Sequence, residues 1–69
     1  MQLSARNILP GTVIKVTKGA VNAEVDIRLK GGDTVVSIIT MGSLKTLGIK
    51  KGKKVYAVIK ASNVMVGID

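Results

Sequence analysis

Residues 22–48 read NAEVDIRLKGGDTVVSIITMGSLKTLG, and this stretch decides the fold class. Its first eight residues alternate strictly between polar and apolar side chains, the pattern of a β-strand with one buried and one wet face. Lys30-Gly31-Gly32-Asp33 then predicts a hairpin turn, because glycine tolerates positive φ. Residues 34–40 are apolar on both faces, which indicates a strand covered on both sides, and a neighbouring subunit is one candidate cover.

The hydrophobic period changes at residue 41, where a short helix is expected over residues 41–48. Leu44 and Leu47 are three residues apart, as on one face of a helix. Thr40 or Ser43 can cap its start, and the final glycine can close its end.

Further strands are expected on either side of this central stretch. Residues 12–18 predict a first strand that Pro10-Gly11 precedes, residues 55–60 a fourth strand and residues 64–68 a short fifth. Three strands, a short helix and two strands follow one another in the order of an oligonucleotide/oligosaccharide-binding (OB) barrel. We therefore expect an all-β, OB-like five-stranded barrel with a short helix between strands 3 and 4, as a single domain over residues 1–69. Pairing of some segments across subunits is compatible with the same pattern.

The length and composition favour self-association. A chain of 69 residues buries only about 60% of the surface that its unfolded form exposes, and this one has neither Cys for disulfides nor His for a zinc staple. Nevertheless, 46% of its residues are hydrophobic and its mean hydropathy is positive. So much apolar surface on so short a chain predicts burial between copies, and hence an obligate oligomer.

The apolar residues do not predict a membrane protein. No apolar run approaches the ~20 residues that cross a bilayer, and no signal-peptide pattern opens the chain. We therefore expect a cytoplasmic location without membrane contact.

The charge balance predicts anionic partners. Eleven Lys or Arg residues face four acids, for a net charge of +7, which suits a small oxyanion, nucleic acid or an acidic surface. The lysines at residues 50–54 have two open interpretations: they bind such a partner, or they keep an apolar oligomer soluble.

Catalysis is poorly supported by the residue types. Without His or Cys, the chain lacks the usual bases and nucleophiles, and its Ser and Thr hydroxyls have no partner that would activate them. Glu24 and Asp26 are two apart on one strand face, which we interpret as a solvated face rather than a catalytic pair. We expect a protein that is not an enzyme and has no site for a bare metal cation.

Two segments at opposite ends of the chain carry the remaining chemistry. Ser4-Ala5-Arg6-Asn7 and Ile59-Lys60-Ala61-Ser62 each join one cation to small hydroxyl or amide residues. Arg and Lys only donate hydrogen bonds, so the two segments together would form a pocket for a fully ionised oxyanion. Thr40 and Ser43 add two hydroxyls at the predicted helix start, where helix capping is an alternative and compatible role.

A second donor cluster is predicted at the turn over residues 18–22. Backbone N–H groups in such turns can form nests that hold anions, although an ordinary hairpin turn explains the same residues.

Nucleic-acid binding is the main alternative function, since both the charge and the OB-like order suit it. Tyr56 is the only aromatic residue, however, and OB folds bind single strands by stacking bases on aromatic side chains.

The chain resembles the Mop family, the molybdopterin-binding-protein-like domains also called molbindins. The resemblance covers essentially the whole chain and rests on motifs in a fixed order: SARN at 4–7, GAVNAEV at 19–25, SIIT at 37–40, Ser43, LGIKKG at 47–52 and IKASNVM at 59–65. It implies molybdate as the ligand, with tungstate as a mimic and no organic cofactor. It also implies intracellular storage and buffering of this anion by a homohexamer, a trimer of dimers. A basic OB-like nucleic-acid-binding module remains the alternative.

The resemblance further implies two types of molybdate site. The first combines two sets of residues at a subunit interface: Ser4, Ala5, Arg6, Lys60, Ala61 and Ser62 of one subunit, with Thr40 and Ser43 of another. The second lies near the three-fold axis and is lined by Gly19, Ala20, Val21, Asn22 and Ala23.

Overall fold

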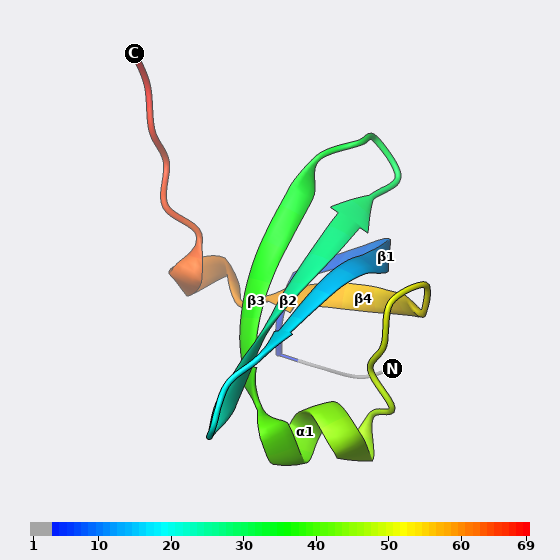
Figure 1. The fold of residues 1–69 in the computed structure, drawn as a ribbon. Helices are drawn as coiled ribbons and strands as arrows, with labels where there is room; N and C mark the ends of the chain where they lie inside the picture. Colours follow the sequence, from blue (N-terminus) through cyan, green and yellow to red (C-terminus); the bar gives the residue numbers. More distant parts are fainter. Residues whose placement is uncertain (1–3) are drawn as a thin grey trace.

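The computed structural model describes residues 4–69 as a curled four-stranded sheet with one short helix (Figure 1). Its elements follow in the order β1 (Asn7–Lys18), β2 (Asn22–Leu29), β3 (Thr34–Thr40), α1 (Met41–Thr46), β4 (Lys54–Ile59) and the 3₁₀ turn η1 (Ala61–Asn63). The strands lie in the order β3-β2-β1-β4, and each neighbouring pair is antiparallel. This arrangement and the short helix after β3 confirm the mostly-β, OB-like fold class, in the form of a half-barrel.

The long strand β1 produces the curl of the sheet. Its first half pairs with β4 and its second half with β2, and a bulge between Val13 and Lys15 bends it. Gly11 lies where the two pairings overlap, and a Cβ there would come within 2.6 Å of the Ile27 side chain and 2.7 Å of the Arg28 carbonyl oxygen. Glycine at this position therefore allows the backbones of β1 and β2 to approach closely.

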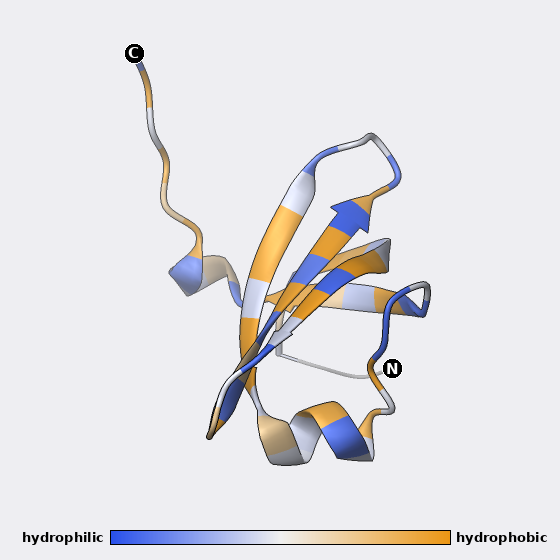
Figure 2. Cartoon of the chain, viewed as in Figure 1, coloured by the Kyte–Doolittle hydropathy of each residue, from blue (hydrophilic) through white to orange (hydrophobic). Residues whose placement is uncertain are grey.

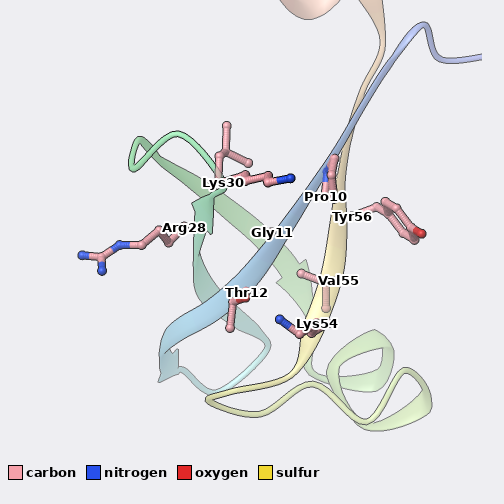
Figure 3. A pocket seen from close by; sticks show the side chains of 9 residues that line it. Pro10, Gly11, Thr12, Arg28, Lys30, Lys54, Val55 and Tyr56 are labelled. Atoms are coloured by element: carbon pink, nitrogen blue, oxygen red, sulfur yellow. The ribbon is translucent and has the colours of Figure 1, made fainter.

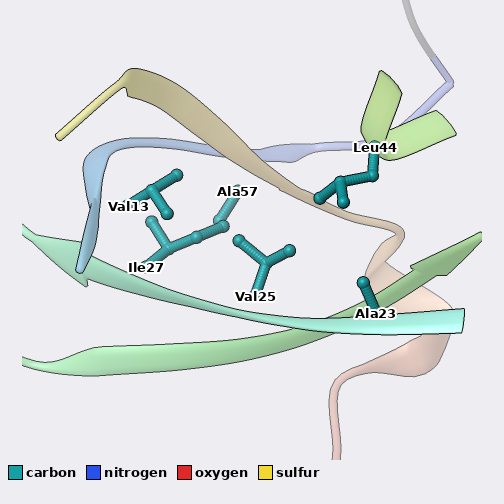
Figure 4. Close-up of a cluster of buried hydrophobic side chains, with 6 residues drawn as sticks. All are labelled: Val13, Ala23, Val25, Ile27, Leu44 and Ala57. Carbon is teal, nitrogen blue, oxygen red and sulfur yellow. The ribbon is translucent and has the colours of Figure 1, made fainter. Parts of the chain in front are cut away.

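The concave face of the sheet holds the hydrophobic core. The alternation of apolar and polar residues is visible along β2 (Figure 2), and the buried side chains gather inside the curl (Figure 4). They are Val13, Ala23, Val25, Ile27, Leu44 and Ala57. Leu44 is the one buried residue of α1, so the helix closes one end of the half-barrel through this side chain.

The predicted caps of α1 are confirmed. The Ser43 backbone N–H donates to Thr40 Oγ1 at 3.0 Å, which makes Thr40 the N-cap. Gly48 has a φ of 62°, and its N–H donates to the Lys45 carbonyl at 3.1 Å. The helix itself ends at Thr46, two residues before the predicted end, and the following residues form the C-terminal turn.

β1 begins earlier than predicted. Pro10-Gly11 does not precede the strand but lies inside it, because the strand already starts at Asn7. Pro10 faces Tyr56 of β4, and the pairing with β2 begins only at Gly11. Proline is tolerated there because one side of this half of β1 needs no ladder donor. β4 begins at Lys54 and ends at Ile59, one residue before the predicted limit at each end.

The predicted fifth strand over residues 64–68 is not formed in the described chain. After η1 the chain runs away from the sheet (Figure 1), and Met65, Val66 and Ile68 are more than 90% exposed, at 94%, 92% and 94%. A strand exists only by pairing with another strand edge. Because the tail leaves the two sheet edges β3 and β4, its apolar pattern finds no ladder within the chain.

None of the helices within residues 4–69 has the length and apolar character to span a bilayer.

Candidate functional site

The pairing of β1 with β4 brings the two terminal donor segments together. Asn7 lies opposite Ile59, and the Asn7 side-chain amide donates to the Ile59 carbonyl oxygen at 3.2 Å. Arg6 precedes Asn7 and Lys60 follows Ile59, so the two cations lie at the same end of this strand pair. Both side chains are exposed and available to a ligand.

The turn η1 adds backbone donors beside these cations. Lys60 caps the turn in an extended conformation, and its carbonyl accepts the Asn63 N–H at 2.8 Å. The first N–H groups of such a turn have no acceptor within it, so those of Ala61 and Ser62 can serve a ligand. No acidic residue lies within residues 4–7 or 59–62, so the segments carry cations and neutral donors without a competing carboxylate.

A second group of donors lies at the start of α1. The Thr40 hydroxyl donates to Ser43 Oγ at 3.0 Å while accepting from the Ser43 N–H. This arrangement uses the Thr40 hydrogen and leaves the Ser43 hydroxyl hydrogen available for an anion. The capping role of Thr40 is therefore formed, whereas its hydroxyl hydrogen is directed to Ser43 rather than to a ligand. A role of Thr40 in anion binding stays a prediction.

The turn between β1 and β2 lies beside this helix start. Its Gly19 N–H donates to the Asn22 carbonyl at 2.8 Å, and the Met41 N–H donates to the Val21 carbonyl at 2.8 Å. Asn22 also lies opposite Thr40 across β2 and β3. The turn and the helix start, which are distant in the sequence, therefore form one corner of the molecule.

The residues of this turn are not equally accessible. Ala20, Val21 and Asn22 are exposed, whereas Ala23 is 2% exposed and belongs to the core. The side chain of Ala23 therefore packs inward, and only the backbone there remains a candidate for ligand contact.

The two donor groups belong to opposite edges of the sheet. Thr40 ends β3, and Lys60 follows β4, and these are the first and last strands of the order β3-β2-β1-β4. Among residues 4–69, none of the side-chain hydrogen bonds connects one group to the other. One chain thus presents two separate half-sets of donors.

The acidic pair of β2 differs in part from the sequence interpretation. Glu24 is exposed, as expected of a solvated face, but Asp26 is half-buried. Its Oδ1 is buried and has no hydrogen-bond partner among the described residues. The described residues contain no group of three or more His, Cys, Asp or Glu that could hold a metal ion.

The chain is similar in sequence to a known domain family and to several known proteins. The family model for the TOBE domain matches residues 3–66. Molybdenum-pterin-binding protein 3 of Clostridium pasteurianum is 50% identical over 66 residues, which are 96% of this chain and 97% of that protein. A probable molybdenum-pterin-binding protein of Haemophilus influenzae is 44% identical over the full length of both chains.

Solved structures agree with the sequence relatives. MopII from Clostridium pasteurianum superimposes with a TM-score of 0.91 at 42% identity, covering 97% of this chain and all of that one. ModG, a cytoplasmic molybdate-binding protein solved with molybdate bound, gives a TM-score of 0.95 at 51% identity and covers all of this chain, which spans 49% of its length. The chain therefore belongs to the TOBE-domain family, among the Mop-type molybdenum-pterin-binding proteins that it resembles over nearly its whole length.

Proposed function

We propose that this protein binds molybdate as the bare oxyanion and thereby stores and buffers it in the cytoplasm, without a chemical step. The observation that carries the proposal is the pairing of Asn7 with Ile59, because Arg6 and Lys60, which only donate hydrogen bonds, adjoin this pair at the same end of the two strands. The relatives support it by their names, and ModG by its bound molybdate.

The chemistry of the donor set favours a fully ionised oxyanion. Every oxygen of the molybdate dianion accepts hydrogen bonds, so a shell made only of donors satisfies it. Phosphate near neutral pH keeps a proton that needs an acceptor, and such a shell disfavours it. Sulfate has the same charge but is smaller, so a rigid pocket must reject it by size, whereas tungstate matches molybdate in size and charge.

The proposed interface site takes its two halves from different copies. Arg6, Lys60 and the residues beside them in segments 4–6 and 60–62 would form one half, and Thr40 and Ser43 of a second copy would form the other. The opposite sheet edges to which the two halves belong in one chain support this division. We assign the second type of site to the backbone and exposed residues of the turn over 19–23.

The exposed tail supports assembly through strand exchange. The concave face opens into a hollow of about 320 Å³ whose lining includes Ile39 of β3 and Val58 of β4, the two edge strands. Residues 64–68 of a second copy would pair along these edges, complete the barrel and bury the apolar tail. Because Lys60 to Ser62 immediately precede the tail, the exchange would also carry a donor segment to the second copy.

A further apolar surface supports association beyond a dimer. Val36 and Ile38 on the convex face of β3 are 56% and 69% exposed within one chain. The sequence pattern of β3 predicted cover on both sides, and another subunit is the cover that we propose. We infer a homohexamer built as a trimer of dimers.

Calorimetric titration tests the function directly. Molybdate should bind much more tightly than sulfate, and tungstate should compete with it. Absence of heat with molybdate, or equal affinity for molybdate and sulfate, would contradict the proposal. A gel-shift with a single-stranded oligonucleotide at physiological salt separates the alternative, because an OB-like nucleic-acid-binding module would shift it and an oxyanion store would not.

A further inference from the structure

The strand register aligns three polar residues across the outside of the half-barrel. Thr12 of β1 lies directly opposite Arg28 of β2 and directly opposite Lys54 of β4. Directly opposed residues project from the same face, with Cα atoms about 5 Å apart. Two cations therefore flank one hydroxyl, with roughly 10 Å between their Cα atoms across the two strand pairs.

A hollow of about 540 Å³ lies over this row, lined by residues 10–12, 28–30 and 54–56 (Figure 3). The ammonium groups of Lys30 and Lys54 point toward β1 from two sides, while the side chains of Arg28 and Tyr56 extend outward on opposite sides. Its size is within the range of about 300–1,000 Å³ that is usual for small-molecule sites.

The lining combines positive charge with an apolar floor. It contains three cations and no acidic residue, and Pro10, Leu29 and Val55 contribute carbon surface. Tyr56 adds a 57% exposed ring at the edge. Gly11 contributes backbone alone, because any side chain there would collide with β2. An inorganic oxyanion would leave this apolar surface uncovered, whereas an organic anion would cover it.

This hollow is distinct from the proposed molybdate site. The pair Asn7 and Ile59 marks the end of the β1–β4 ladder beside Arg6 and Lys60, and the pair Thr12 and Lys54 lies five residues further along it. At about 3.3 Å per residue, the two pairs are roughly 16 Å apart.

We propose that this hollow binds an organic polyanion of nucleotide size, with its phosphate or carboxylate groups between Arg28, Lys30 and Lys54 and its ring or carbon portion on the apolar floor. The three cations are exposed at the surface and screened by salt, so the interaction is weak and sensitive to ionic strength. Binding at this hollow would give a role to cations other than Arg6 and Lys60 that contribute to the net charge of +7.

ATP without magnesium is the probe, titrated at low salt into the ¹⁵N-labelled assembled protein with two-dimensional NMR detection. We expect saturable shifts at Gly11, Thr12, Lys54 and Tyr56, persisting in saturating molybdate. Adenosine and inorganic triphosphate should each bind at least fivefold more weakly than ATP. Shifts confined to residues 4–7 and 60–62, or loss of ATP binding in molybdate, would overturn the proposal.

Two double variants with the same change in net charge provide the decisive comparison. Arg28→Gln with Lys54→Gln should weaken ATP binding at least tenfold while leaving molybdate affinity unchanged. Lys45→Gln with Lys50→Gln, which removes two exposed lysines that do not line the hollow, should change ATP affinity less than twofold. Equal weakening in both double variants would show general attraction to a basic protein and would refute a defined site.

Discussion

Replacement of Arg6 by alanine should weaken molybdate binding, and lower and upper limits of the change in Kd can be estimated. The guanidinium would donate charge-assisted hydrogen bonds to the anion, each worth about 1.5–3 kcal/mol. Since about 1.4 kcal/mol is a tenfold change in Kd, loss of one such bond corresponds to a roughly 10- to 150-fold weaker Kd. Lys60→Ala should give a loss of similar order.

The size of the loss also reports whether a second copy closes the pocket. Arg6 and Lys60 are exposed in the single chain. Exposed ion pairs contribute only about 1 kcal/mol or less, which is about fivefold in Kd. A loss above tenfold therefore requires that the anion is desolvated, as it would be between two subunits.

A double-mutant cycle by calorimetry provides the measurement. If Arg6 and Lys60 hold the same anion, their combined effect should differ from the sum by about 0.5–3 kcal/mol. Lys51→Ala removes one positive charge at an exposed turn residue and serves as the control, with an expected change below twofold. Light scattering should give the same mass for all variants. Unchanged Kd in both single variants would refute the site assignment.

Three further predictions concern the tail and the fold. Deletion of residues 64–69 should lower the mass seen by light scattering and abolish tight molybdate binding, and an unchanged mass would rule out strand exchange. Leu44→Ala should lower the free energy of unfolding by about 2–5 kcal/mol in urea titrations, because its buried side chain closes one end of the core. Gly11→Ala should cost about 1–3 kcal/mol in the same assay because of its contact with Ile27, and no loss of stability would contradict the close approach of β1 and β2.

The central part of the fold was predictable because its signals are local. The strict alternation along β2, the glycines of the following turn and the capping pattern of Thr40 each act over a few residues. The start of β1 was not predictable in this way. Residues 7–11 form a strand because β4 lies beside them, and no local period marks this partner.

The fifth strand shows a different limit of sequence reasoning. Residues 64–68 have the apolar character of a strand, but their composition does not state which chain provides the edge. In the described chain the segment remains unpaired and exposed. The prediction of strand character and the prediction of self-association are therefore linked, since a strand formed by this segment would need an edge from another copy.

Whether the sequence could indicate that donor residues lie together depended on the strand register. The juxtaposition of segments 4–7 and 59–62 was expected as a condition of anion binding, and the β1–β4 ladder provides it. The row of Arg28, Thr12 and Lys54 had no such signal, because these residues are far apart in the sequence. Only the register on both sides of β1, set next to its bulge, aligns them.

The incomplete barrel and the divided donors have a common structural origin. Both open edges of the sheet, β3 and β4, end at a donor group, Thr40 with Ser43 on one and Lys60 to Ser62 on the other. A strand added to these edges by a second copy would stabilise the barrel and bring donors of two chains to the same boundary. Because an anion held there would contact both chains, its binding would also stabilise the assembly. Molybdate should therefore raise the Tm of the full-length protein, and it should not do so for the variant that lacks residues 64–69.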